Sequence, residues 1–517
     1  MNKLGKIFNL VIKTIGFIVV ALLVIALVFW FIWRPIKIAS YKPLEPEHLA
    51  QKEAYLTNIA KTFTDNKNAK RPNIIYINFD DMGYGDLSCY GNRLIKTPFM
   101  DSLAANGIRM TDFYSCSPVC TPSRAGLLTG RYPKRAYASD HVYFPNDHPI
   151  GKMRIVQGLK NEIPRDEIMI SEVLKANGYA TAIIGKWHLG DLKGHLPNDF
   201  GFDYFFGGRY SNDMIPYHIY RNEQIVERDE KQLVDPVFPY GYYDMDTPIT
   251  GKPSDQTKLT ENYTKEAVDF ITKNKEQPFF LYLPHAFPHV PHFSSARQNG
   301  QSAGGLYGDV IEDLDWSVGQ IMAALAEQDL LDNLLIFITS DNGGDLQGSV
   351  GNLRGRKQLT YEGGQRVPMI IYGKTFINQP KVTDAMATNL DIFPTILEVL
   401  NIDAPTDRII DGKSMLPMIS QNENSPHELI YYNAAASGNI VGVRDSLYKY
   451  HEGANGIHIP LAGNFGTTKK LGAQLTNLKL DNEDHNLIKK YPQRAEKLKQ
   501  NMLDKQKALD ENRRGWR

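Results

Sequence analysis

Four short apolar runs, each accompanied by polar residues, constrain what this chain can fold into. They are "IIYINF" (74–79), "YATAIIGKWHLG" (179–190), "PFFLYLPHAFPHVPH" (278–292) and "NLLIFITSDNGG" (333–344). The apolar part of each stretch has the length of a buried strand and is rich in Ile, Phe and Tyr. Helical patterns lie between them, such as "ISEVLKANG" (170–178) and "GDVIEDLDWSVGQIMAALAEQ" (308–328). This alternation predicts an α/β fold with a mostly parallel central sheet flanked by helices.

The polar residues at the ends of these runs predict a ligand site. In sheets of this kind, ligands bind beyond the carboxyl ends of the strands. The residues found there are Asp80, Asp81, Lys186, His188, His289, Asp341 and Asn342. Three carboxylates and an amide carbonyl are hard oxygen ligands, and crowded carboxylates are costly unless a cation lies among them. We therefore expect one pocket with a cation. Several protein oxygens favour calcium, although the spacing leaves magnesium open.

The same motifs also have ordinary structural explanations. An Asp pair after a strand often serves only a turn or a cap, and "SDNGG" (340–344) has the composition of a turn. A zinc site at Cys116 and Cys120 is disfavoured, because the second Cys or His pair of a tetrahedral site is missing.

The stretch "CSPVCTPSRAGLLTGR" (116–131) holds two of the three cysteines of the chain. Pro122 suits the first turn of a helix, Thr121 can cap it, and Gly130 is a suitable stop. Cys120 is therefore expected at the positive N-terminus of a helix, a position that activates a nucleophile. The alternative is a buried structural cysteine, which is common for free thiols.

The segment Cys120-Thr121-Pro122-Ser123-Arg124 resembles the Cys-x-Pro-Ser-Arg signature of type I sulfatases. Six further blocks resemble the same family in the same order. They are "DDMGYGDLSCYGN" (80–92), "TDFY" (111–114), "GKWHLG" (185–190), "GGRYSND" (207–213), "DNGG" (341–344) and "RKQLTYEGGQRVP" (356–368). The resemblance covers residues 71 to 420 approximately and is closest to the arylsulfatase A group. It implies an alkaline-phosphatase-like fold with a smaller C-terminal antiparallel sheet.

The resemblance also implies a metal site and a modified nucleophile. Asp80, Asp81, Asp341 and Asn342, together with the modified Cys120, would bind a calcium ion. A formylglycine-generating enzyme would oxidise Cys120 to formylglycine (3-oxoalanine), whose hydrate has two hydroxyls on one carbon. One hydroxyl would attack sulfur with help from Asp341.

The remaining implied roles concern the sulfate group and the proton transfers. His188 would take the proton of the second hydroxyl, which expels sulfate, and Arg124 would orient the modified residue. The sulfate oxygens would be bound by Lys186, Ser211 and Lys357. His289, chosen over His285 by its offset from "FFLY", would contact the substrate and protonate the departing alcohol.

The implied reaction is the hydrolysis of a small-molecule or carbohydrate sulfate ester. One alternative is a phosphodiester or phosphonate monoester hydrolase of the same superfamily, and another is an inactive binding protein in which Cys120 stays unmodified. Selectivity is expected from loops 136–165 and 205–255. There "YFPNDH" (143–148) and "FPYGYYDMD" (238–246) offer aromatic surfaces and carboxylates.

The N-terminus predicts a membrane anchor. Residues 14–33 carry no charge, and such a segment at about 1.5 Å per residue crosses about 30 Å of hydrocarbon. A cleaved signal peptide would have a shorter apolar region ending in small residues, whereas this one ends in Trp33, Arg34 and Pro35. Lysines before the segment favour a single-pass protein whose catalytic domain lies on the non-cytoplasmic side, periplasmic or extracellular.

Four regions follow from these patterns. Residues 1–34 are the cytoplasmic stub and transmembrane anchor, and 35–71 are a partly helical linker that stands the body off the bilayer. Residues 72–420 are the catalytic domain, and 421–517 are a C-terminal α+β subdomain with a charged helix at 485–510. The 58 Lys and Arg residues balance 58 Asp and Glu, so no overall field attracts nucleic acid, which we do not expect as a partner.

Overall fold

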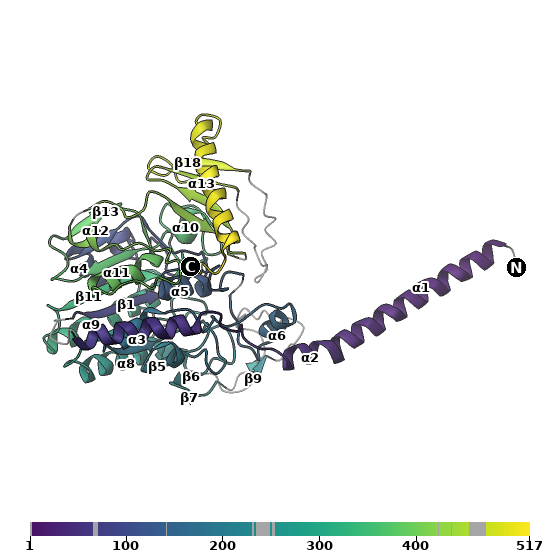
Figure 1. The fold of residues 1–517 in the computed structure, drawn as a ribbon, viewed down its shortest axis with the longest axis horizontal. Helices are drawn as coiled ribbons and strands as arrows, with labels where there is room; N and C mark the ends of the chain where they lie inside the picture. Colours follow the sequence, from purple (N-terminus) through teal and green to yellow (C-terminus); the bar gives the residue numbers. More distant parts are fainter. Residues whose placement is uncertain are drawn as a thin grey trace.

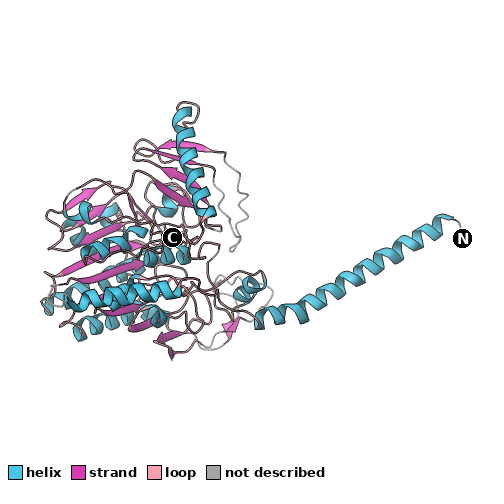
Figure 2. Cartoon of the chain, in the orientation of Figure 1, coloured by secondary structure: helices cyan, strands magenta, loops and turns pink. Residues whose placement is uncertain are grey.

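The structure is a computed structural model that describes residues 3–65, 71–140, 142–229, 232–233, 249–250, 254–421, 423–435, 437–453 and 472–517. At its centre is a ten-stranded sheet in the order β13-β2-β12-β11-β1-β10-β4-β5-β6-β7 (Figures 1 and 2). Its strands are β1 (Asn73–Phe79), β2 (Ile108–Met110), β4 (Ala180–Ile184), β5 (Tyr204–Gly208), β6 (Ile219–Arg221), β7 (Gln224–Glu227), β10 (Phe279–Pro284), β11 (Leu334–Ser340), β12 (Met369–Tyr372) and β13 (Lys381–Thr383).

The middle of the sheet is parallel. Strands β11, β1, β10, β4 and β5 all run in the same direction. Towards the edges, β12, β6 and β7 pair antiparallel with their neighbours. The α/β prediction is confirmed, and the four apolar runs supply the parallel centre of a sheet that is mixed overall.

Helices cover both faces of the sheet. Ile74 and Tyr76 of β1 enter one core, whereas Ile75 and Ile77 enter the other, as the period-2 geometry of a strand requires. The first core is covered by α5 (Cys120–Thr129), α7 (Ile170–Ala176), α11 (Ile392–Val399) and α12 (Leu416–Ser420). The second is covered by α4 (Pro98–Ala105), α8 (Leu259–Lys273) and α9 (Gly305–Glu327). Burial on both faces explains why the central runs are continuously apolar.

A separate antiparallel sheet forms near the C-terminus. Its strands are β15 (Ile430–Asn433), β16 (Ile440–Arg444), β17 (Tyr448–His451) and β18 (Gln474–Asn477). Helix α13 (Pro492–Glu511) packs on it, with Leu498 and Met502 in one cluster with Val443 and Leu475. The helix begins later than predicted, with Pro492 in its first turn. Other short elements are α6 (Pro149–Val156), α10 (Glu362–Gln365), β3 (Phe113–Tyr114), β8 (Gln232–Leu233), β9 (Ile249–Thr250) and β14 (Ala387–Thr388).

The N-terminal helix leaves the body as a long exposed rod (Figure 1). It comprises α1 (Lys3–Val28), a π-helical turn (Phe29–Trp33) and α2 (Arg34–Ala39). The stretch Ile12–Ala39 is long and apolar enough to cross a membrane, and none of its most apolar window is buried.

Helix α3 (Leu49–Asp65) packs on the body, so the prediction that residues 35–71 stand the body off the bilayer is wrong for this helix. Ile59 is buried in the main core. Lys52 lies 2.6 Å from Glu172 at the start of α7, with side chains 6% and 8% exposed. The sequence of this segment predicts a polar helix. Its few apolar and charged contacts with α7 form between segments that are distant in sequence, so the sequence pattern does not reveal them.

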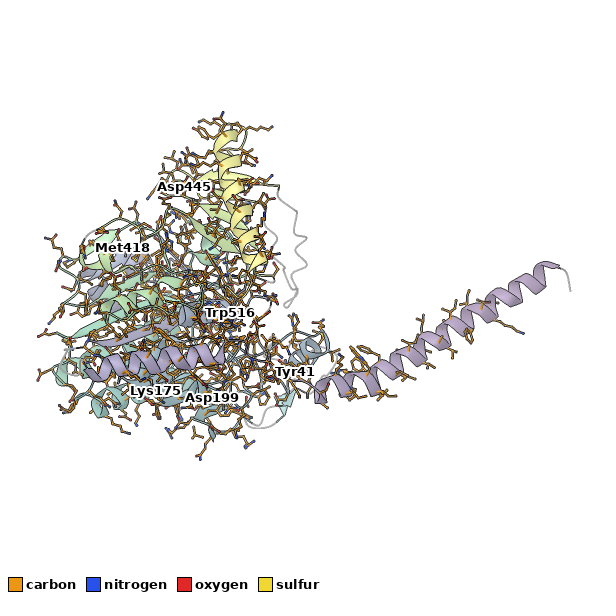
Figure 3. The ribbon with its side chains drawn as sticks, in the orientation of Figure 1. Tyr41, Lys175, Asp199, Met418, Asp445 and Trp516 are labelled. Atoms are coloured by element: carbon orange, nitrogen blue, oxygen red, sulfur yellow. The ribbon has the colours of Figure 1, made fainter. Side chains whose placement is uncertain are left out.

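The anchor joins the body at the same end as the carboxyl ends of the parallel strands. Tyr41, labelled at this junction in Figure 3, donates to Glu162 (2.5 Å). Glu162 accepts from Asn146, and the same loop carries Tyr143, whose carbonyl lies 3.0 Å from Nε2 of His188. The junction and the predicted ligand pocket therefore share one loop.

Candidate active site

Two neighbouring parallel strands bring the acidic residues together. Phe79 of β1 lies opposite Ser340 of β11, so Asp80 and Asp341 follow at the same level. Asp81 has a left-handed backbone, with φ of 68°, which is uncommon for a residue with a side chain and is often found at functional sites. Ligand oxygens of Asp80, Asp81 and Asp341 all lie within 4.8 Å of one another, and all three residues are buried.

This cluster has the donor set of a site for a hard cation. Asn342 donates to Oδ1 of Asp81 (2.7 Å) through its amide nitrogen, which leaves its amide oxygen available. Oδ1 of Asp80 and Oδ1 of Asn342 are both buried without a hydrogen-bond partner. Buried acceptors of this kind are costly unless something satisfies them. The four oxygen-bearing side chains predicted from the sequence therefore fit a divalent cation such as calcium.

Each carboxylate is paired with a basic side chain. The pairs are Arg124 with Asp341 (2.8 Å), Lys186 with Asp80 (2.5 Å) and Lys357 with Asp81 (2.6 Å). Burial alone would raise the pKa of Asp80, but Lys186 and Arg124 lower it well below its usual range. The three charge pairs cancel, so a divalent cation would leave the pocket with a net positive charge, which suits an anionic ester.

Cys120 lies at the start of α5 and is buried, 2% exposed. Burial raises the pKa of its thiol to about 11, although the nearby charge of Lys186 opposes the shift. Burial therefore opposes the activation of this thiol that is expected at a helix N-terminus. An unmodified Cys120 is a weak nucleophile at neutral pH.

The predicted helix end is present, but the predicted cap is not. Gly130 closes α5 in the left-handed conformation, with φ of 66°. The residue before the helix is Val119, without a side-chain cap. The hydroxyl of Thr121 instead donates to the carbonyl of His188 (3.3 Å) and accepts from the amide of Tyr143 (3.1 Å). Thr121 thus ties α5 to the two segments that flank the pocket.

His188 is held as a neutral ring with one free nitrogen. Its backbone is left-handed, with φ of 64°. Burial lowers the pKa of His188 well below its usual value, and Lys186 and Arg124 lower it further. Nε2 lies 3.0 Å from the carbonyl of Tyr143 and donates to it, because a carbonyl can only accept. Nδ1 is then the unprotonated nitrogen, and it is buried without a partner.

His289 and Ser211 complete the polar surroundings of the acidic cluster. Nε2 of His289 lies 3.6 Å from Asp81, and its ring lies 3.4 Å from the hydroxyl of Ser211. Ser211 accepts from Lys186 (3.1 Å). His285 lies elsewhere, fully buried beside Phe79, and burial lowers its pKa to about 3. The structure therefore brings His289, rather than His285, to the other candidate residues.

Comparison with known proteins identifies the family. The family model described as Sulfatase matches residues 72–402. The chain belongs to the sulfatase family. A second model, described as N-sulphoglucosamine sulphohydrolase, C-terminal, matches residues 355–452. The predicted type I sulfatase membership is confirmed, and the protein is a sulfuric ester hydrolase.

Individual relatives cover most of this sulfatase. Human steryl-sulfatase is 34% identical over 442 residues, which cover 72% of this chain and 74% of the relative. Human N-acetylgalactosamine-6-sulfatase is 36% identical over 375 residues, which cover 70% and 68%. A sulfatase structure from work on the metabolism of multiple glycosaminoglycans by Bacteroides thetaiotaomicron is 28% identical, with a TM-score of 0.71 and coverage of 85% and 100%.

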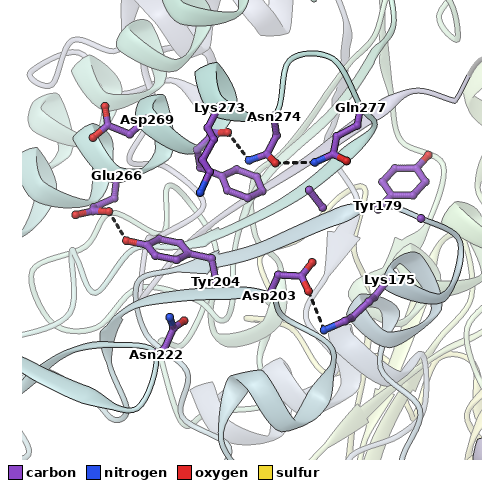
Figure 4. Close-up of a pocket in the computed structure, with 13 residues that line it drawn as sticks. Lys175, Tyr179, Asp203, Tyr204, Asn222, Glu266, Asp269, Lys273, Asn274 and Gln277 are labelled. Carbon is purple, nitrogen blue, oxygen red and sulfur yellow. Dashed lines mark hydrogen bonds and ion pairs between the residues drawn. The ribbon is translucent and has the colours of Figure 1, made fainter.

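A separate groove of about 780 Å³ lies away from the acidic cluster, at the amino ends of β4 and β5 (Figure 4). Some of its polar groups form ion pairs or hydrogen bonds with one another. Lys175 lies 2.7 Å from Asp203, and Tyr204 donates to Glu266. None of the candidate site residues lines this groove.

Several residues that support the candidate site were not predicted from the sequence. Asp86 is buried and accepts from the amides of Gly83 (2.6 Å) and Ser349 (2.7 Å), which holds the turn after Asp81. Asn389 donates to the hydroxyl of Ser123 (2.8 Å), and Ser123 donates to the carbonyl of Asp341. Asp86 and Ser123 lie within the quoted blocks, but no local pattern pointed to Asn389.

Proposed function

We propose that this sulfatase hydrolyses sulfate esters through a hydrated formylglycine formed from Cys120, with calcium held by Asp80, Asp81, Asp341 and Asn342. One observation carries the proposal. Three carboxylates, each paired with a basic side chain, lie together at the start of α5, and oxygens of Asp80 and Asn342 there have no hydrogen-bond partner. Lys186, Lys357, Asp80 and Asp341 all act electrostatically on Cys120. A hydrated aldehyde there supplies two hydroxyls on one carbon, one to attack sulfur and one to release sulfate. Calcium supplies a positive charge for a sulfate oxygen.

The basic side chains are proposed to bind the sulfate group. Lys186 and Lys357 have their ammonium groups beside the acidic cluster, and Ser211 shares a hydrogen bond with Lys186 (3.1 Å). Both lysine side chains are largely buried, 0% and 10% exposed, and there they stabilise negative charge on the sulfate oxygens. Arg124 donates to Asp341 (2.9 Å) and to the carbonyl of Lys186 (2.9 Å). It therefore orients the groups around residue 120, with Asp341 placed to accept the first proton.

The two histidines are proposed to handle the remaining protons. Nδ1 of His188 is unprotonated and has no protein partner, so it can accept the proton of the second hydroxyl. Nδ1 of His289 lies 2.6 Å from the carbonyl of Val290 and donates to it. This hydrogen bond orients the ring so that Nε2 faces Asp81 and Ser211. When the ring is doubly protonated, Nε2 also carries a proton, which His289 would give to the departing alcohol.

The experiment that tests this function has a chemical and a kinetic readout. Mass spectrometry of the peptide that carries residue 120 detects replacement of the thiol by an aldehyde, after co-expression with a formylglycine-generating enzyme. The aldehyde-bearing protein is then assayed with nitrophenyl sulfate and nitrophenyl phosphate, with Cys120→Ala as control. We expect turnover of the sulfate ester. Preferred turnover of the phosphate ester would support the phosphodiester or phosphonate monoester alternative, and inactivity despite full modification would refute the proposal.

The proposed substrate is a small-molecule or carbohydrate sulfate ester. The relatives named steryl-sulfatase and N-acetylgalactosamine-6-sulfatase support both classes. Of the two loops predicted to set selectivity, the segment 238–246 lies outside the described residues. In the other, Tyr143 is fully buried, so it supports His188 and offers no aromatic surface to a ligand. A panel of sulfated sugars and sulfated sterols, compared by kcat/KM, separates the two classes.

The protein is further proposed to be a single-pass membrane protein with its catalytic domain on the non-cytoplasmic side. The exposed apolar helix Ile12–Ala39 supports the anchor. Because the anchor joins the body at the end that carries the pocket, the site would lie close to the membrane surface. Protease added to intact cells or spheroplasts should remove the body and leave the anchor. Full protection of the body would contradict this topology.

A further inference from the structure

The segment 354–366, which we call the Lys357 loop, connects the pocket to the C-terminal subdomain. On the pocket side, Nζ of Lys357 donates to Asp81 (2.6 Å). The amide of Gln358 donates to the carbonyl of Pro118 (2.9 Å), just before α5. Gln358 has a left-handed backbone, with φ of 72°. A loop held in this conformation needs support from its surroundings.

The opposite side of the Lys357 loop rests on Lys449 of β17. The side chain of Lys449 is 0% exposed and lies 3.1 Å from Glu362 and 2.8 Å from Glu483. Its Nζ also donates to the carbonyl of Thr360 (3.0 Å). An ammonium group has three N–H donors, and each has an acceptor here. One buried cation of the C-terminal subdomain thus holds both a side chain and the backbone of the loop.

Other residues of the subdomain contact the same loop. Glu483 accepts from the amide of Glu362 (2.8 Å). Nε2 of His451 lies 2.5 Å from the hydroxyl of Thr360, and its ring stacks on Tyr361 with centroids 5.3 Å apart. Burial raises the pKa of Glu483 to about 7, and Glu362 adds to the shift while Lys449 opposes it. The two glutamates remain close together because Lys449 lies between them.

We propose that Lys449 is a positioning residue for Lys357, and that the C-terminal subdomain thereby sets the affinity of the pocket for the sulfate group. This inference rests on the proposed function of Lys357. Without Lys449, Glu483 would lose its buried ion-pair partner while it lies close to Glu362, which keeps Arg366 at 3.7 Å. The carbonyl of Thr360 would also lose a donor. The Lys357 loop then moves away from the subdomain, and Lys357 leaves its position beside Asp81.

The test compares Lys449→Met with a matched control from the same subdomain. In Lys449→Met we expect the KM for nitrophenyl sulfate and the inhibition constant of inorganic sulfate to rise about 10-fold to 100-fold, with a smaller change in kcat. Lys479 makes an exposed ion pair with Asp384 of the catalytic body (2.5 Å). Lys479→Met removes a lysine from the same boundary, and both constants should stay within about twofold of wild type. Equal effects of the two variants would overturn the inference.

A double-mutant cycle separates positioning from a general loss of structure. If Lys449 acts through Lys357, adding Lys449→Met to Lys357→Met leaves the KM unchanged. Independent, additive effects would assign Lys449 a structural role only. Thr360→Val is the milder variant if Lys449→Met does not fold, because it removes only the hydroxyl that faces His451. It should raise the KM in the same direction but less, and an unchanged KM would count against the proposal.

Hydrogen exchange tests the same inference without enzyme activity. The amides of Lys357 and Gln358 are bonded to the carbonyls of Gly344 (3.0 Å) and Pro118 (2.9 Å), so they should exchange slowly in the wild type. They should exchange faster in Lys449→Met but not in Lys479→Met. If the amides of Lys357 and Gln358 exchanged at the wild-type rate in Lys449→Met, the positioning role would be refuted, whatever the activity of the variant. If the aldehyde-bearing wild type itself were inactive, the proposed function would be refuted, and not the positioning role alone.

Discussion

Replacing His188 with Gln should leave the rate of the first turnover nearly unchanged and should slow all the following turnovers. Nε2 of His188 donates to the carbonyl of Tyr143 (3.0 Å), and Nδ1 is buried without a partner. The amide nitrogen of Gln can donate to the same carbonyl, but Gln has no basic nitrogen. The substitution thus keeps the structural hydrogen bond and removes only the proton acceptor proposed for sulfate release.

The size of the effect follows from the role of a positioned base. Such a group contributes about 10²-fold to 10⁴-fold to a rate, so the steady-state kcat of His188→Gln should fall by that factor. Burial and the charges of Lys186 and Arg124 lower the pKa of His188 well below its usual value. A depressed pKa means that the ring stays neutral as the pH falls through 6.5. The wild-type kcat should therefore show no loss of this base in the pH range where an exposed histidine titrates.

A rapid-mixing assay with nitrophenyl sulfate measures both steps. The variant should release one equivalent of nitrophenol per aldehyde-bearing chain at nearly the wild-type rate and then stall, because the alcohol leaves before sulfate does. The wild type should show no such separation if release of sulfate is fast. If His188→Gln lost the first turnover and the steady state by the same factor, His188 would act on binding or attack, and the reasoning would be refuted.

Three further outcomes are expected. Lys52→Met should lower the free energy of unfolding by about 3–5 kcal/mol, because Glu172 stays buried without its partner. A urea midpoint equal to that of the wild type would mean that α3 only links the anchor to the body. Removal of divalent cations should lower Tm and abolish activity, with calcium restoring both, because the buried oxygens of Asp80 and Asn342 that have no hydrogen-bond partner lose their ligand; an unchanged Tm would contradict the cation site. Burial lowers the pKa of His285 to about 3, so its contribution to stability is present above pH 6.5 and lost as the pH falls towards 3. His285→Asn should therefore make unfolding in urea less dependent on pH between 6.5 and 4, and an unaltered slope would contradict the assignment of His285 to the core.

The acidic part of the site was predictable because strand geometry is local. Asp80 and Asp341 follow two apolar runs directly, and the carboxyl ends of neighbouring parallel strands meet at one edge of the sheet. Cys120 and Gly130 were likewise placed at the two ends of a helix by residue type alone. These predictions depend on spacing along the chain, which is unchanged by folding.

Other features became visible only with the tertiary contacts. Thr121 bonds to His188 and Tyr143 instead of capping its helix, because segments distant in sequence pack against α5. Helix α3 has the composition of a spacer, yet Lys52 finds a buried partner on α7. No motif marks Lys449, whose three acceptors come from the Lys357 loop and Glu483.

The amino-acid sequence by itself determined the sulfatase family, the parallel centre of the sheet and the residue types of the pocket, since these follow from local pattern and order. The tertiary structure decided the charge states and hydrogen-bond partners. The pKa of Cys120 and the free nitrogen of His188 depend on burial and on neighbours from distant segments. Desolvation and Coulomb forces act through space, and so the chemistry of these side chains is set by the packed fold rather than by the order of residues.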